Sequence, residues 1–180
     1  MDNNVLSKRN KSRILLIDSV LFVIFLFFDQ LTKYMAVGRL KEQPPFIILD
    51  GILEFQYLEN HGSAFGLFQN QKTFILLISG TFMLLLVFVL FRLPGTKKYL
   101  PLDILVTLIL SGGIGNMIDR VIHDYVIDFI YFKIINYPIF NVADIYVVVG
   151  TILIAILCLF IYEEKDLDFL SFKGGKQEDK

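Results

Sequence analysis

The segment Ser111-Gly-Gly-Ile-Gly-Asn-Met-Ile-Asp-Arg120 leaves one long apolar run, and Phe140-Asn-Val-Ala-Asp144 enters the next. Between them lies Val126-Ile-Asp-Phe129, another acidic residue in an apolar context. Ionisable groups at membrane depth are costly, and they usually face a protein interior or a water-filled cavity. This part of the chain therefore predicts membrane helices that carry a functional site. Its candidate residues are Asn116, Asp119, Arg120, Asp128, Asn141 and Asp144.

The apolar residues outside this segment also fall into long runs. The chain has 180 residues, of which 55% are hydrophobic, and its mean hydropathy is +0.62. A spanning helix needs about 20 mostly apolar residues. The runs predict an all-α membrane fold with four transmembrane helices, at about 14–37, 74–93, 100–118 and 144–162. We expect one four-helix membrane domain over 1–166, with a polar cytoplasmic tail over 167–180.

The first connection, about 38–72, predicts a small β element outside the membrane. Two short β-prone runs, 46–49 and 52–58, flank Asp50-Gly51, a dipeptide typical of hairpins. A glycine-punctuated loop follows. The later segment 125–138 is rich in aromatic residues, and we interpret it as an interfacial connection. The charged residues from 163 onward are expected to be disordered.

Positive charges predict the orientation. Lysine and arginine gather before the first helix, between the second and third helices, and after the fourth. Such residues favour the cytoplasmic side. Both termini are therefore expected inside, and Asp29, Asn60, Asn116 and Asp144 should meet near the outer surface. Asp18 and Asp103 should lie near the cytoplasmic ends, facing headgroups or other helices.

Several functions are disfavoured by composition. The net charge of -1 leaves no global basic face for nucleic acid. The single cysteine, Cys158, excludes an intrachain disulfide. His61 and His123 lack the spacing of metal ligands, so we expect neither a metal nor another cofactor.

Each candidate also has a purely structural interpretation. Asn141 and Asp144 fit an N-cap and its third helical residue. Beside Asp128, however, Asp144 would complete a carboxylate pair suited to acid–base chemistry. Asp29 and Lys33 share a helix face, which favours an ion pair over catalysis.

The remaining polar residues of this region are equally open to a structural role. Asp119 with Arg120 can hold a helix end, and Asn116 can make an interhelical hydrogen bond. The glycines at 112, 113 and 115 favour close helix packing.

Five motifs in this order resemble a known family, the lipoprotein signal peptidases (signal peptidase II). They are Asp-Gln-x-Thr-Lys at 29–33, Asn-x-Gly-x-Ala-Phe-Gly at 60–66, Gly-Asn-x-x-Asp-Arg at 115–120, Val-x-Asp-Phe at 126–129 and Phe-Asn-x-Ala-Asp at 140–144. Each motif alone is weak, but together on four apolar runs they are specific.

The resemblance implies an aspartic peptidase of the bacterial cytoplasmic membrane. Its partners would be membrane lipids and diacylglyceryl-modified prolipoproteins, which it would cut just before the lipidated cysteine. We expect a monomer. The family's catalytic pair corresponds to Asp128 and Asp144. Its supporting residues correspond to Asp29, Lys33, Asn60, Gly62, Asn116, Asp119, Arg120 and Asn141.

Two other functional classes stay open at this point, and one of them is a non-catalytic membrane assembly factor. A small proton- or ion-coupled transporter could use Asp29, Asp128 and Asp144 as a relay, although the sequence has no internal repeat of the kind transporters show. Within a catalytic pair, a helix N-terminus favours an ionised Asp144, whereas apolar neighbours favour a protonated Asp128.

Overall fold

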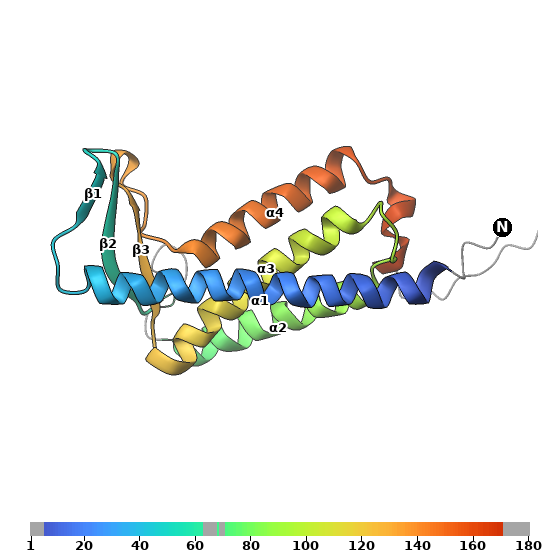
Figure 1. Cartoon of the computed structure of the whole chain (residues 1–180), viewed down its shortest axis with the longest axis horizontal. Helices are drawn as coiled ribbons and strands as arrows, with labels where there is room; N and C mark the ends of the chain where they lie inside the picture. Colours follow the sequence, from blue (N-terminus) through green and yellow to red (C-terminus); the bar gives the residue numbers. More distant parts are fainter. Residues whose placement is uncertain (1–5, 63–67, 69–70, 171–180) are drawn as a thin grey trace, which may run out of the picture.

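The computed structural model describes residues 6–62, 68 and 71–170. Four long helices form a bundle, and a three-stranded sheet lies across one end of it (Figure 1). The other end carries the first and last described residues. We call these the sheet end and the terminal end of the bundle.

The four expected helices are confirmed, and all four are long and apolar enough to cross a membrane. Their bounds are α1 Leu6–Leu40, α2 Lys72–Arg92, α3 Leu100–His123 and α4 Val142–Phe160. The third helix runs past its expected end at 118, because the polar motif at 115–120 is itself helical. It ends at His123, and its C-cap residue Asp124 adopts a left-handed conformation with φ 71°.

Helix α3 lies at the centre and packs against the other three helices. Its glycines permit this packing. A Cβ atom on Gly112 would lie 2.5 Å from the carbonyl oxygen of Ala143, and one on Gly115 would collide with the Asp29 carboxylate. The expected role of these glycines in close helix packing is therefore confirmed. The site described below depends on this close approach of α1 and α4 to α3.

The sheet has the order β1-β2-β3 and is antiparallel throughout. Strands β1 (Phe46–Leu49) and β2 (Leu53–Asn60) form the expected hairpin around Gly51, whose φ is +69°. The third strand, β3 (Val126–Phe132), lies within the segment 125–138, where the sequence predicted only an interfacial connection. It pairs along β2, so that Leu58 lies opposite Asp128.

The expectation of disorder from residue 163 onward is wrong for its first part. Residues Glu164–Leu170 form a short 3₁₀ helix, η3, at the terminal end. Tyr99 donates a hydrogen bond of 2.9 Å to the carbonyl of Asp166, and Lys98 pairs with the Asp166 carboxylate at 2.6 Å. Tertiary contacts of this kind order a segment whose charge predicts a solvated tail.

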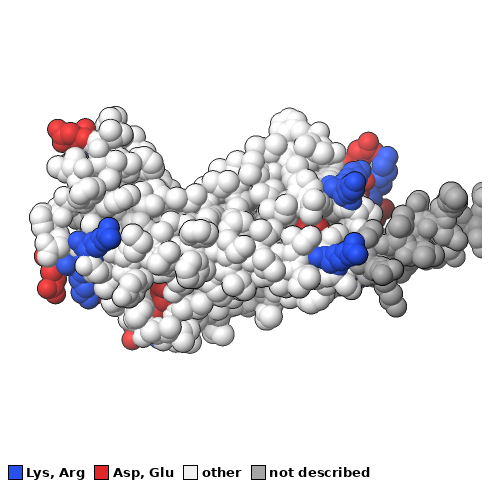
Figure 2. Space-filling model, viewed as in Figure 1, with Lys and Arg blue, Asp and Glu red and all other residues white. Residues whose placement is uncertain are grey.

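On the face shown in Figure 2, the charged side chains of the described residues gather toward the two ends of the bundle. Between the two ends the helices expose many large apolar side chains, as a membrane-spanning segment does. In the same view a hollow separates the sheet from α4. This hollow leads to the candidate site.

Candidate active site

Asp144 lies in the first turn of α4, where Asn141 caps the helix. The Asn141 backbone N–H donates to Asp144 Oδ2 at 3.0 Å, and the Asp144 N–H donates to Asn141 Oδ1 at 2.9 Å. This reciprocal arrangement is a capping box. The structural interpretation of these two residues is therefore confirmed, and it fixes the position of one carboxylate.

Asp128 lies in the middle of β3 and is 1% exposed. Its two carboxylate oxygens accept hydrogen bonds from Asn141 Nδ2 at 2.6 Å and from Asn60 Nδ2 at 2.9 Å. The same Asn141 side chain thus contacts Asp128 and caps the turn that carries Asp144. One residue links the two carboxylates.

The orientation of three side-chain amides follows from neighbours that can only donate. The Gly62 N–H donates to Asn60 Oδ1, the Asp144 N–H donates to Asn141 Oδ1, and the Lys33 ammonium donates to Asn116 Oδ1. The oxygen of each amide is thereby fixed toward its donor. The NH₂ group of the same amide then lies on the other side, where it can donate to a carboxylate. Asn116 Nδ2 donates to Asp144 Oδ1 at 2.9 Å. All these amides therefore present donors to the two carboxylates.

A buried charge cluster lies beneath this pair. Lys33 is 1% exposed and pairs with Asp29 Oδ2 and with Asp119 Oδ2, both at 2.9 Å. The expected Asp29–Lys33 ion pair is confirmed. Gln30, which the sequence analysis missed, donates to both Asp29 and Asp119 at 3.1 Å. Its place inside the motif at 29–33 was the only available signal.

The two carboxylates of this cluster also hold the backbone near the candidate pair. Asp29 Oδ1 accepts a hydrogen bond of 3.0 Å from the Ala143 N–H, next to Asp144. Asp119 Oδ2 accepts one of 3.2 Å from the Ile127 N–H, next to Asp128. Helices α1 and α3 thereby set the relative position of β3 and α4.

Arg120 ties the β2 end to α3. Its guanidinium donates to the Gly62 carbonyl at 2.9 Å and to the Asn116 carbonyl at 3.3 Å. Hydrogen bonds and ion pairs therefore join all ten candidate residues into one network. Residues 63–66 of the motif at 60–66 lie outside the described residues.

Burial raises the pKa of Asp128 to about 7, and the negative charge of Asp144 contributes to the rise. The hydrogen bonds from Asn60 and Asn141 and the charge of Lys33 act in the opposite direction. Desolvation is the largest of these effects. A carboxyl group with such a pKa can hold a proton near neutral pH and release it.

A groove of about 320 Å³ opens beside the pair and has Asp144 in its wall. It corresponds to the hollow between the sheet and α4 in Figure 2. The other lining residues are apolar or aromatic: Phe132, Ile135, Tyr137, Phe140, Ile145, Val148 and Val149. A largely apolar groove that ends at a carboxylate suits a lipid-exposed chain with a polar, reactive bond.

The histidines lie apart from this network. The rings of His61 and His123 contact Tyr125, with centroid distances of 5.4 Å and 5.8 Å. Across residues 6–62, 68 and 71–170, no three His, Cys, Asp or Glu side chains come together as a metal site.

Comparison with known proteins points to one family. The model of the family described as Signal peptidase (SPase) II matches residues 21–160. The chain is 38% identical over 148 residues to a lipoprotein signal peptidase of Clostridium tetani, covering 81% of this chain and 92% of that one. It is 39% identical over 141 residues to one of Caldanaerobacter subterraneus, covering 78% and 93%.

Solved structures agree with the sequence comparison. A bacterial membrane enzyme determined at 2.3 Å resolution superposes with a TM-score of 0.73 at 29% identity, covering 89% of this chain and 94% of that one. A second, determined at 1.9 Å, has a TM-score of 0.69 at 31% identity, with coverage of 81% and 94%. The fold, the matched length and the identity together show that this chain belongs to the signal peptidase II family.

Proposed function

We propose that this protein is a membrane aspartic endopeptidase that removes signal peptides from diacylglyceryl-modified prolipoproteins. The observation that carries this proposal is the carboxylate pair Asp128 and Asp144, linked by Asn141 and surrounded by amide donors. Purified protein should cleave a lipid-modified precursor just before its modified cysteine. It should leave the unmodified precursor uncut, and equal cleavage of both precursors would contradict the proposed substrate.

In the proposed reaction the two carboxyl groups have different roles. The first turn of α4 favours a negative charge on Asp144, which accepts a proton from the attacking water. Asp128 is buried and holds a proton, which it donates to the oxygen of the scissile carbonyl. Water adds to the carbonyl carbon, and collapse of the tetrahedral intermediate breaks the C–N bond. The leaving nitrogen takes the proton that Asp144 accepted from water, Asp128 recovers its proton from the former carbonyl oxygen, and no acyl-enzyme forms.

The apolar groove supports a substrate that arrives from the bilayer. A signal peptide is itself an apolar segment, and its lipid-modified cysteine lies at the membrane surface. The groove and the carboxylate pair lie at the sheet end of the bundle, where the spanning helices end. The substrate can therefore reach the pair by lateral movement within the membrane.

The transporter alternative is not favoured, because the family and the relatives are peptidases. One residue of the relay that a transporter would need has a different role in the structure. Asp29 binds Lys33 and the backbone of α4, so it is engaged in positioning. Asp128 and Asp144 are left as the reactive pair.

We expect kcat/KM to fall as pH rises above about 7. Asp128 must be protonated to donate, and its pKa of about 7 makes the protonated form the minor one above that pH. The decline should approach tenfold per pH unit. In Asn60→Ala the loss of a donor to Asp128 should move this decline to higher pH.

The pH dependence is measured with a lipid-modified precursor between pH 5 and 9. Asp124→Asn is the matched control, because Asp124 is an exposed carboxylate at the same end of the molecule. An identical alkaline limb in wild type and Asn60→Ala would show that another group titrates. The two carboxyl groups are coupled, so the measured values belong to the pair.

The proposed orientation places both termini in the cytoplasm and the candidate site outside. We expect a cysteine at Glu42, near the sheet, to react with an impermeant thiol reagent on intact cells. Cysteines at Thr96 and Lys165, which are exposed at the terminal end, should react only after lysis. Each is introduced singly in a Cys158→Ser background. Labelling of Thr96 in intact cells would reverse the orientation.

A further inference from the structure

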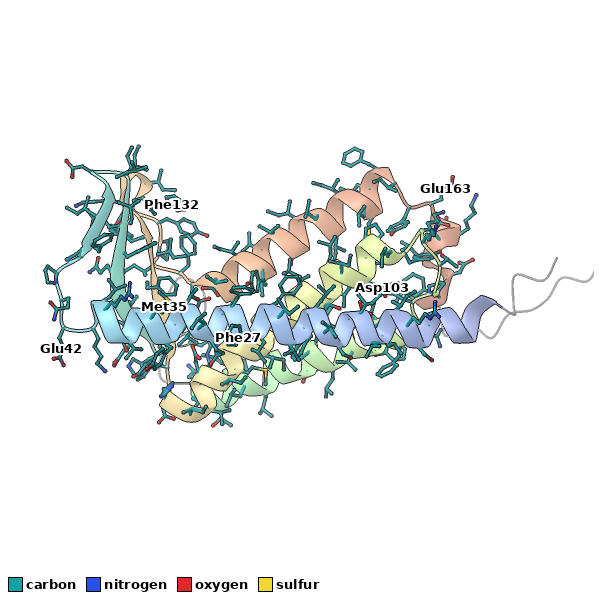
Figure 3. All side chains as sticks on the ribbon, in the orientation of Figure 1. Phe27, Met35, Glu42, Asp103, Phe132 and Glu163 are labelled. Atoms are coloured by element: carbon teal, nitrogen blue, oxygen red, sulfur yellow. The ribbon has the colours of Figure 1, made fainter. Side chains whose placement is uncertain are left out.

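A second group of buried polar side chains lies at the terminal end, away from the carboxylate pair. It consists of Asp18 on α1 and of Asp103 and Thr107 on α3, which are 4%, 3% and 1% exposed. Figure 3 labels Asp103 and places it at this end of the bundle. None of the three belongs to the hydrogen-bond network of the candidate active site.

These side chains present oxygen atoms that lack a hydrogen-bond partner within the described chain. They are both carboxylate oxygens of Asp18, Oδ2 of Asp103 and the hydroxyl of Thr107. Hydroxyls elsewhere in the helices donate to their own helix, as Thr81 and Thr151 do to carbonyls four residues earlier. Buried polar groups are normally satisfied, and an uncompensated buried carboxylate is especially costly. A bound ligand that donates hydrogen bonds would satisfy these oxygens.

Asp18 and Thr107 line a groove of about 640 Å³ between α1 and α2 over α3. Its other walls are almost entirely apolar, and they run from Leu15 to Val23 on α1 and from Gly80 to Phe91 on α2. At 1.5 Å per residue these stretches are about 12 Å and about 16 Å long. Half the hydrocarbon core of a bilayer is about 15 Å thick. The groove is therefore about as long as the acyl chains of one leaflet are deep.

We propose that this groove binds a phospholipid with a primary ammonium head group, of the phosphatidylethanolamine type, from the leaflet at the terminal end. The ammonium group has N–H donors for the oxygens of Asp18 and Thr107, which line the groove, and an acyl chain lies along the apolar walls. A metal ion would satisfy the oxygens but leave the apolar groove unexplained. A lipid with a primary ammonium head group accounts for both features.

Binding is tested on the purified full-length protein in detergent, by native mass spectrometry and thermal unfolding. The probes are phosphatidylethanolamine, phosphatidylcholine and phosphatidylglycerol with identical acyl chains. Phosphatidylethanolamine should bind on the order of tenfold more tightly than phosphatidylcholine, whose quaternary ammonium has no N–H donor. It should also raise the Tm.

Two variants locate the interaction. Without lipid, Asp18→Asn should unfold at a higher temperature than wild type, because an uncompensated charge is gone. With phosphatidylethanolamine this advantage should disappear, because the variant binds the lipid on the order of tenfold less tightly. Thr107→Val should weaken binding by a smaller factor. Thr81→Val is its matched control, since the Thr81 hydroxyl is satisfied within α2.

Several results would overturn the proposal. One is equal affinity for phosphatidylethanolamine and phosphatidylcholine, and another is unchanged lipid affinity in Asp18→Asn and Thr107→Val. Stabilisation by Na⁺ or Mg²⁺ alone, equal to that by the lipid, would assign the oxygens to a cation. No Tm change with any probe would mean that Asp18 and Asp103 are satisfied by protonation. None of these measurements depends on peptidase activity, so they test this site separately from the proposed function.

Discussion

Replacing Asp128 or Asp144 by asparagine is expected to lower kcat at least about 10³-fold, because each variant removes one member of a catalytic unit. The side chains keep nearly the same shape, but an amide can neither accept the water proton nor supply a carboxylic proton. The measurement is cleavage of a lipid-modified precursor by purified protein. Helix content and Tm are recorded for every variant, and Asp124→Asn serves as the control.

The hydrogen-bond network predicts a modest structural cost in the same variants. Both Asp128 oxygens face NH₂ donors, from Asn60 and Asn141. An asparagine at 128 has only one oxygen, so one of these donors would face another donor. We expect folded variants with a slightly lowered Tm. Turnover like that of wild type in either variant would contradict the assignment. Full loss of wild-type activity in a chelator, restored by zinc, would instead indicate a metal enzyme.

Infrared spectroscopy can assign the two roles. At neutral pH a protonated-carboxyl C=O band should be present in wild type and in Asp144→Asn, and absent in Asp128→Asn. The reverse pattern would make Asp144 the acid. Because the pair is coupled, each variant is measured across a pH range to follow the proton of the remaining partner.

The second large effect is expected from Lys33→Met, which should destabilise the protein by about 3–5 kcal/mol. Lys33 lies between the carboxylates of Asp29 and Asp119, which are 0% and 2% exposed. Removing the ammonium leaves two buried acidic groups without their counter-ion. By contrast, Lys41→Met removes a half-exposed pair with Glu59, and it should change the stability far less than Lys33→Met does.

Lys33→Met should also lower activity for a separate reason. The ammonium holds the oxygen of the Asn116 amide, and this directs Asn116 Nδ2 to Asp144. A double variant, Lys33→Met with Asp29→Asn, removes one of the stranded carboxylates and should recover part of the stability. Cleavage should stay low, because the oxygen of the Asn116 amide then keeps only the hydrogen bond of 3.1 Å from Asn141 Nδ2. Recovery of stability and activity together would show that Lys33 acts only through folding.

The sequence by itself determined the membrane helices, the hairpin and the cap of α4. These features depend on local chemistry: runs of apolar residues, the turn preference of Asp50-Gly51, and Asn141 three residues before Asp144. The order of the five motifs likewise indicated the family. The sequence also selected the ten candidate residues that the folded chain brings into one network.

Only the tertiary structure decided that β3 and η3 form. It also decided which groups of the network donate hydrogen bonds and which accept them. Residues 126–132 have aromatic and β-branched side chains that suit either an interface or a strand, and pairing with β2 makes them a strand. The charged segment 164–170 becomes ordered through contacts with Tyr99 and Lys98. The burial that raises the pKa of Asp128 comes from elements distant in sequence. The role of Gln30 depends in the same way on the approach of α3, and no local pattern encodes either.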